Sequence, residues 1–188
     1  MPFKLITIGA SLGGLAALRT ILKHLPTNLP AAIAIVQHRH KESANTLAAH
    51  LQQFTPLPVY EVEDKQIISP GEVYLAPADY HLLVEPGYFS LSTDDPVSYA
   101  RPSIDVLLES AADAYGEQAI GVLLTGANQD GVRGLFAIKV HGGLAIVQLP
   151  ETAESPVLPM AAISTVAIDW ILPLEQIAAH LVQLCQPG

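Results

Sequence analysis

Five continuous apolar runs constrain the fold of this chain more than any other feature of its sequence. They read "FKLITIG", "AAIAIVQ", "AIGVLLTG", "LAIVQ" and "AIDWILP". A strand with one face in water alternates apolar and polar residues, whereas runs that are apolar throughout are typical of a parallel sheet buried on both faces. The sequence therefore predicts a central parallel sheet whose two faces are both covered.

Helical patterns between these runs supply the cover. Ser103 follows Pro102 and precedes an apolar-periodic stretch, which is typical of a helix N-cap. The alternation of strand and helix predicts a doubly wound, three-layer α/β sandwich with right-handed crossovers. The expected helices cover residues 14–24, 43–54, 103–115, 131–141, 158–163 and 174–184.

The middle of the chain departs from this alternation. Residues 71–92, "GEVYLAPADYHLLVEPGYFSLS", hold short β-rich segments separated by Pro77 and by Pro86-Gly87. We interpret them as an antiparallel addition at the sheet edge, with a hairpin at residues 85–88. The following stretch, residues 92–103, is expected to be a loop.

Size and charge limit the classes of function. A chain of 188 residues is expected to form a single domain over residues 1–188. Its formal net charge of −9 argues against nucleic acid and against anionic membranes as partners. The single cysteine, Cys185, fits a reducing compartment, and neither a signal peptide nor a membrane-spanning run is present. We expect a soluble cytoplasmic protein without membrane insertion.

Three polar residues stand where the predicted strands end, which is where open parallel sheets bind ligands. Ser11 lies in "GASLG", a match to the G-x-S-x-G turn that exposes a nucleophilic serine between strand and helix. His38 follows the second apolar run and would act as its base, and Asp130 would orient the imidazole, although an aspartate here also suits a plain helix N-cap. The order serine, histidine, aspartate differs from that of α/β-hydrolases, so such a triad would be convergent.

Two other kinds of site compete with a triad. Gly9-x-Ser11-x-x-Gly14 is close to a dinucleotide fingerprint, and Arg39 would suit the 2′-phosphate of NADP. His38-x-His40 lacks the cysteines or carboxylates of a metal centre, so no metal is expected. The remaining histidines are interpreted as surface or capping residues: His24, His50, His81, His141 and His180.

Several segments resemble, in the same order, the catalytic domain of the chemotaxis protein-glutamate methylesterases (CheB). They are "IGASLGG", "VQH", "GEVYLAPADYHLLV", "RPSIDVLLESAADAYGEQAIGVLLTGANQDGVRGLFAIKVHGG", "AIVQ" and "ILPLEQIA", and the resemblance runs from about Ile6 to Ala178. It implies a parallel α/β fold with an antiparallel addition, with Ser11 as nucleophile, His38 as base and Asp130 as the residue that orients it. It also implies hydrolysis of glutamate methyl esters on chemoreceptors, some glutamine deamidation, and no cofactor.

The chain departs from the family pattern near the serine. Leu12 stands where the family commonly has threonine or serine, Ala127 replaces a methionine, and "LPETAESPVLP" replaces the usual D-E-A/S-T loop. Leu12 and Ala127 are expected at the oxyanion and substrate pocket, where backbone amides would still donate. These changes keep open a non-catalytic or repurposed binding module. Full-length members of the family carry an N-terminal receiver domain, whereas this sequence starts at the catalytic sheet. The chain is therefore expected to be either an excised fragment or a stand-alone member, and Met1 just before the first strand favours the stand-alone form.

Overall fold

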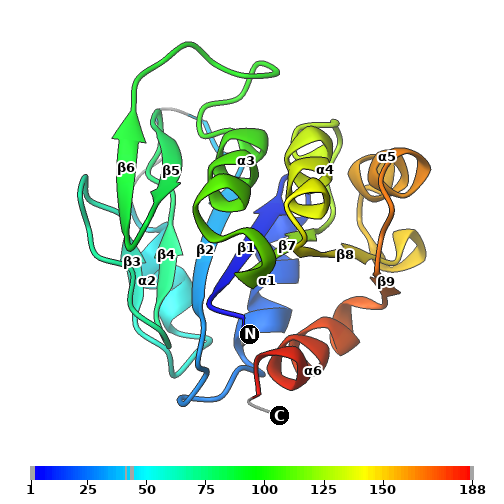
Figure 1. The fold of residues 1–188 in the computed structure, drawn as a ribbon, viewed down its shortest axis with the longest axis horizontal. Helices are drawn as coiled ribbons and strands as arrows, with labels where there is room; N and C mark the ends of the chain where they lie inside the picture. Colours follow the sequence, from blue (N-terminus) through cyan, green and yellow to red (C-terminus); the bar gives the residue numbers. More distant parts are fainter. Residues whose placement is uncertain (1–2, 41, 43–44, 187–188) are drawn as a thin grey trace.

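Seven parallel strands form the central sheet of the computed structural model, which describes residues 3–40, 42 and 45–186. Their order is β3-β4-β2-β1-β7-β8-β9 (Figure 1). All five predicted apolar runs contain a strand of this sheet, and every residue of β1 is buried. The strands are β1 (Leu5–Ala10), β2 (Ala32–Gln37), β3 (Val59–Glu61), β4 (Val73–Leu75), β7 (Ala119–Leu123), β8 (Leu144–Gln148) and β9 (Trp170–Leu172).

The predicted helices are all present, with shorter bounds in most cases. The expected helix over residues 43–54 is α2, which begins only at Leu47, and residues 43 and 44 lie outside the described residues. Ser103 caps its helix as predicted, because its hydroxyl accepts a hydrogen bond from the Val106 amide. The helices are α1 (Gly14–Leu22), α2 (Leu47–Gln52), α3 (Ile104–Tyr115), α4 (Val132–Val140), α5 (Val157–Thr165) and α6 (Leu174–Cys185).

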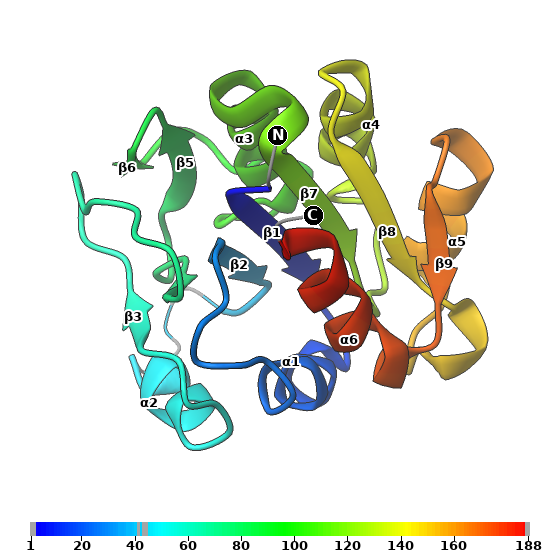
Figure 2. The ribbon, with the colours of Figure 1, turned by 60° about the horizontal axis from the view of Figure 1, so that its bottom comes forward.

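Each face of the sheet has its own hydrophobic core. Along β1, Ile6 and Ile8 point into a core shared with α1, α2 and α6, and Leu5 points into a second core shared with α3, α4 and α5. Figure 2 shows α1, α2 and α6 on one side of the sheet and α3 and α4 on the other. The three-layer, doubly wound sandwich predicted from the apolar runs is therefore confirmed.

The middle of the chain differs in two respects from the prediction. The predicted antiparallel strands form a separate two-stranded sheet and do not extend the edge of the central sheet. Residues 81–92 do form an antiparallel hairpin, β5 (His81–Glu85) with β6 (Tyr88–Ser92), in which Glu85 faces Tyr88. It packs against α3, where the Val84 amide donates to the Ser110 hydroxyl at 2.9 Å. The prediction was wrong for β4, which pairs in parallel with both β2 and β3 inside the main sheet. Its three residues are buried on both faces, as a central parallel strand requires.

The helices are short relative to a bilayer. The two longest in the described part of the chain, α3 and α6, have 12 residues each, and none there combines the length and apolar character needed to cross a membrane.

Candidate active site

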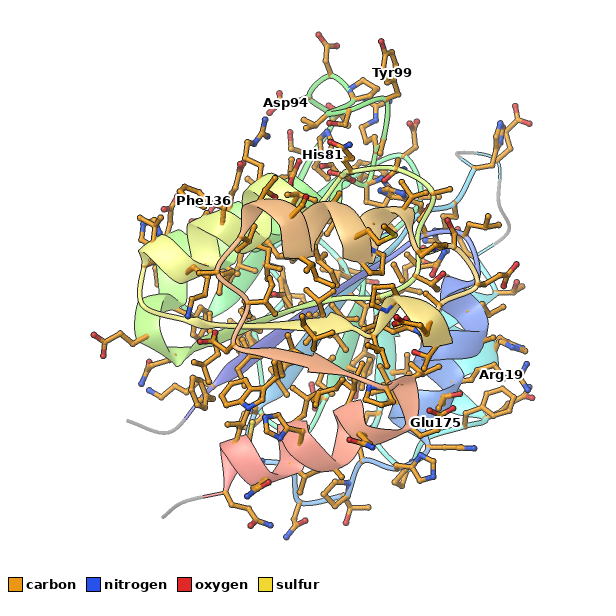
Figure 3. All side chains as sticks on the ribbon, turned by 90° about the vertical axis from the view of Figure 1, so that its right-hand side faces the viewer. Arg19, His81, Asp94, Tyr99, Phe136 and Glu175 are labelled. Carbon is orange, nitrogen blue, oxygen red and sulfur yellow. The ribbon has the colours of Figure 1, made fainter. Side chains whose placement is uncertain are left out.

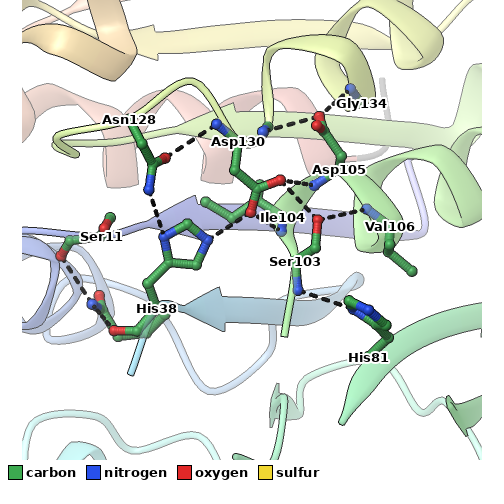
Figure 4. Close-up of polar contacts among 12 residues, drawn as sticks. Ser11, His38, His81, Ser103, Ile104, Asp105, Val106, Asn128, Asp130 and Gly134 are labelled. Atoms are coloured by element: carbon green, nitrogen blue, oxygen red, sulfur yellow. Dashed lines mark hydrogen bonds and ion pairs between the residues drawn. The ribbon is translucent and has the colours of Figure 1, made fainter. Parts of the chain in front are cut away.

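Three neighbouring strand ends bring the predicted residues to one edge of the sheet. Ser11 follows β1, and its amide donates to the Thr125 carbonyl at 3.0 Å. His38 follows β2, and its amide donates to the Ala10 carbonyl at 3.0 Å. Asp130 lies in the loop between β7 and α4, and its Oδ2 is 2.6 Å from His38 Nε2 (Figure 4). The sheet order β2-β1-β7 is what places these three residues side by side.

Close backbone packing shapes the turn that carries Ser11. Gly13 caps α1 with a φ of +80°, in the left-handed region that favours glycine. Gly126 lies so near that a Cβ there would be 3.2 Å from the Cβ of Ser11. The side-chain Nε2 of Gln37 donates to the backbone carbonyls of both Ser11 (2.9 Å) and His38 (3.0 Å). These two hydrogen bonds connect the turn after β1 to the turn after β2.

Asp130 is a buried carboxylate held by four donors. Only 1% of it is exposed. Besides His38, the donors are the Ser103 hydroxyl at 2.7 Å and the amides of Ile104 at 2.7 Å and Asp105 at 3.0 Å. Burial alone would raise the pKa of Asp130, but the hydrogen bonds from His38 and from these groups outweigh it and hold the pKa below its usual range. The carboxylate is thus charged and immobile before any ligand arrives.

The first turn of α3 supplies most of those donors. Its free amides and positive dipole end point at Asp130, which is where an anion is most stable on a helix. A second buried acid, Asp105, accepts the amides of Gly131 (2.9 Å) and Gly134 (2.8 Å) with one oxygen. Burial, with a further contribution from the charge of Asp130, raises the pKa of Asp105 to about 6. Asp105 therefore binds a proton at a higher pH than Asp130 does, although the two acids share one helix end.

The other ring nitrogen of His38 faces Asn128. The Asn128 Oδ1 accepts the Asp130 amide at 3.1 Å, so its Nδ2 is the atom turned to the imidazole, 3.3 Å from His38 Nδ1. Because Nδ2 can only donate, Nδ1 is the acceptor and the ring proton resides on Nε2, facing Asp130. Asn128 was not predicted as a site residue, although it lies only two residues before Asp130 in "ANQDG".

The serine end of this arrangement is open. Figure 4 shows Ser11 beside the imidazole, and within the described residues its hydroxyl has no hydrogen-bond partner. The amides of Leu12 and Gly13 are likewise without partners there, and they lie just before α1, whose dipole favours a developing anion. Ser11 and His38 line a cavity of about 570 Å³ together with Arg39, His40, Asp79, Pro96, Ser98, Tyr99, Ala100, Arg101, Pro102 and Asn128.

The two predicted pocket residues lie in different places. The Leu12 side chain is 54% exposed and lines a second opening that also contains Ser11 and His38. Its carbonyl accepts the Thr125 hydroxyl at 2.8 Å, which fixes the backbone on which the Leu12 amide is presented. Ala127 is exposed and is not among the described residues that line either opening.

Two expectations about basic residues fail. Arg39 offers little of its side chain to a 2′-phosphate, because it is 7% exposed and its Nη2 is 3.0 Å from both Glu61 Oε2 and the Ala76 carbonyl, although its Nε and Nη1 have no hydrogen-bond partner in the described part of the chain. His81 was expected at the surface or at a cap, but it is buried between the Asp95 carbonyl (3.0 Å) and the Ser103 amide (3.2 Å). Among the described residues, no three histidine, cysteine or acidic side chains gather as metal ligands would.

Comparison with known proteins agrees with this geometry. Residues 6–181 match the protein family described as CheB methylesterase. The chain belongs to this family. The CheB catalytic domain of Thermotoga maritima has a crystal structure that superposes with a TM-score of 0.94 at 36% identity, covering 98% of this chain and 100% of that one.

Relatives of this CheB-family chain differ in length. A Leptospira interrogans protein is 45% identical over 187 residues, which are 99% of this chain and 97% of that protein, and its name provisionally gives it both methylesterase and glutaminase activity. The Thermotoga maritima protein-glutamate methylesterase/protein-glutamine glutaminase is 36% identical over 185 residues. The protein-glutamate methylesterase FrzG of Myxococcus xanthus is 41% identical. This chain spans about half the length of these last two, 54% and 55%.

Proposed function

We propose that this protein is a serine esterase that hydrolyses glutamate methyl esters on chemoreceptor-like proteins and deamidates glutamine at the same site. The observation that carries the proposal is the 2.6 Å contact between His38 and a buried, charged Asp130, at the strand end next to Ser11. That contact leaves Nδ1 as the acceptor nitrogen of the imidazole, next to Asn128, which lines the same cavity as Ser11. Membership of a methylesterase family supports the choice of ester.

In the proposed acylation step, each of the three residues has one role. Ser11 Oγ attacks the ester carbonyl while His38 Nδ1 takes the hydroxyl proton. The imidazolium that forms is stabilised by the carboxylate of Asp130, whose Oδ2 accepts the hydrogen bond from the Nε2–H group throughout. The amides of Leu12 and Gly13 are free to donate to the oxyanion, so the missing hydroxyl at position 12 removes one donor and leaves two. Nδ1 then returns its proton to the methoxide, and methanol leaves.

Deacylation repeats the sequence with water. His38 Nδ1 takes a proton from the water that attacks the acyl-serine, and it returns that proton to Ser11 Oγ as the bond breaks. The products are a glutamate side chain and the free serine. With a glutamine side chain, ammonia is the leaving group and the other steps are unchanged.

The partner and cell compartment of this function are also proposals. The resemblance to chemotaxis methylesterases supports a methyl-accepting receptor as substrate, reached in the cytoplasm by a single catalytic domain over residues 1–188.

A serine-directed fluorophosphonate probe tests the nucleophile. We expect an adduct on Ser11, located by mass spectrometry, that disappears in Ser11→Ala and in His38→Ala. Ser98→Ala is the matched control, because Ser98 lines the same cavity and has no part in the proposed chemistry. Unlabelled wild type should then release methanol from a methyl-esterified receptor domain, and labelling should abolish that release. A folded protein that takes no label would favour the alternative, a binding module that kept the fold and lost the activity.

A further inference from the structure

The loop between β6 and α3 stands at the rim of the cavity that holds Ser11. We call residues 93–101 the Tyr99 arm, after the side chain at its tip. The arm rises beyond the helices around it in Figure 1, and Figure 3 shows Tyr99 at its outer end. Tyr99 lines the cavity together with Ser11 and His38, yet its side chain is fully exposed. An aromatic ring is thus presented to solvent at the mouth of the candidate site.

The tip of the arm is a tight, strained turn. Val97 and Ala100 exchange two backbone hydrogen bonds, of 3.0 and 2.9 Å, around Ser98 and Tyr99. These two residues have φ values of +49° and +64°, which is the left-handed region at both central positions. Such turns normally use glycine or asparagine, because a side chain there costs about 1 kcal/mol or more per residue. A tyrosine here lowers the stability of the turn.

The base of the arm is fixed by polar contacts. The Arg101 guanidinium donates to Asp79 through Nε (3.0 Å) and Nη2 (2.6 Å), and through Nη1 to the carbonyls of Thr93 (2.9 Å) and Asp94 (3.1 Å). These bonds join the two legs of the arm to each other and to the segment before β5. The backbone that carries Tyr99 is therefore held in place, while its ring is fully exposed to solvent.

From this placement we propose that Tyr99 binds the protein substrate, with its ring packed on the surface of the segment that carries the ester. The inference rests on the proposed function, and it assigns the part of the substrate that lies outside the cavity. A small ester is contained in the cavity, whereas a ring at the rim reaches only a ligand that extends past it. Tyrosine gains much contact area for little loss of rotamer freedom, which is why it recurs at protein interfaces. A fixed arm also lowers the ordering cost of binding.

The test compares a protein substrate with a small one. For Tyr99→Ala we expect KM on a methyl-esterified receptor domain to rise about 10-fold or more, as for removal of a buried interface aromatic, with kcat changed little. Hydrolysis of a small nitrophenyl ester and fluorophosphonate labelling should match wild type. Ile67→Ala is the control, because Ile67 is 67% exposed and lies beside Tyr88 at the far end of the hairpin.

A second variant separates recognition from folding. Tyr99→Gly removes the ring and relieves the left-handed strain, so its melting temperature should rise while its KM on the receptor domain also rises. An unchanged KM in both Tyr99 variants would overturn the proposal, and so would an equal loss on the small ester. If wild type itself takes no label, the proposed function fails instead, and the two failures are distinguishable.

Discussion

The two ends of the candidate triad are built in opposite ways. Asp130 is 1% exposed and accepts four hydrogen bonds, from groups that the fold has already placed. Ser11 is half-buried and opens to a cavity, and its hydroxyl is unbonded within the described residues. In the proposed mechanism, the charge that stabilises the imidazolium is thus fixed during folding, whereas the proposed nucleophile is left to be completed by substrate.

The difference has a physical origin. A carboxylate is stable in a protein interior only when most of its acceptor sites are used, so Asp130 is necessarily part of the folded framework. A hydroxyl at a cavity wall is solvated and needs no such support. Changes at the acid end should therefore lower both stability and rate, and changes at the serine end should lower the rate alone.

Asp130→Asn should have the largest combined effect on rate and stability. Asparagine turns one acceptor oxygen into a donor, which then faces either His38 and the Ile104 amide or the Ser103 hydroxyl and the Asp105 amide. We expect kcat on a small nitrophenyl ester to fall about 10,000-fold, as when a triad imidazole is held in the wrong tautomer. The melting temperature should fall too. Ser11→Ala is the comparison, since it should abolish activity with an unchanged melting temperature, and an equally stable Asp130→Asn would contradict the contrast.

Asp105→Asn tests how much the ionisation of a second buried acid beside Asp130 lowers the stability of the protein. The pKa of Asp105 is raised by burial from 3.8 to about 6, so the folded chain binds this proton more tightly than the unfolded chain does. Its contribution to the free energy of unfolding is greatest below about pH 4 and decreases by up to about 3 kcal/mol as the pH rises to about 6. The lowered pKa of Asp130 acts in the opposite sense and only below pH 3.8.

Urea unfolding of wild type and Asp105→Asn between pH 4.5 and 7.5 measures how the free energy of unfolding of each depends on pH. Asparagine keeps the single oxygen that accepts from Gly131 and Gly134, so the fold should persist. The variant should gain stability relative to wild type as the pH rises, with no further gain above about pH 7. A difference that does not depend on pH would show that Asp105 titrates as an ordinary surface acid.

Sequence reasoning predicted which strand ends lie side by side better than it predicted what surrounds them. The strand ends could be predicted because β1, β2 and β7 are long, wholly apolar segments whose local pattern is enough. It missed β3, and it misassigned β4, because strands of three residues carry too little pattern to show their direction. The parallel order of the sheet then decided which strand ends became neighbours.

The contacts around the triad depend on chain segments far apart in sequence. Ser103 was predicted as a helix cap, which it is, but its bond to Asp130 joins residues 27 positions apart. The burial of His81 and the pairing of Arg39 with Glu61 arise in the same way, from packing of the hairpin and of β3. No local pattern carries such information, so these features required the structure.

Ser103→Ala should have a smaller effect than either acid variant. It removes a helix cap and one hydrogen bond to the charged carboxylate, and we expect a loss of about 1–2 kcal/mol in the free energy of unfolding. Because three donors to Asp130 remain, kcat should fall only about 10-fold. Ser110→Ala, two turns along α3, is the matched control, since its hydroxyl bonds Val84, Val106 and Leu107 and does not contact the triad. Equal effects of the two variants on kcat would mean that Ser103 acts only as a cap.

Asn128→Ala should have the smallest effect, and one of opposite sign. In the resting site the Asn128 amide occupies His38 Nδ1 at 3.3 Å, and Nδ1 is the lone pair that the Ser11 hydroxyl needs. A neutral hydrogen bond of this kind contributes about 0.5–1 kcal/mol, so its removal should speed fluorophosphonate labelling by about 2- to 5-fold. Gln129→Ala, an exposed neighbour, should label at the wild-type rate. Slower labelling of Asn128→Ala would reverse the interpretation, because it would mean that the amide positions the imidazole for Ser11 and that the serine end is more preorganised than its unbonded hydroxyl indicates.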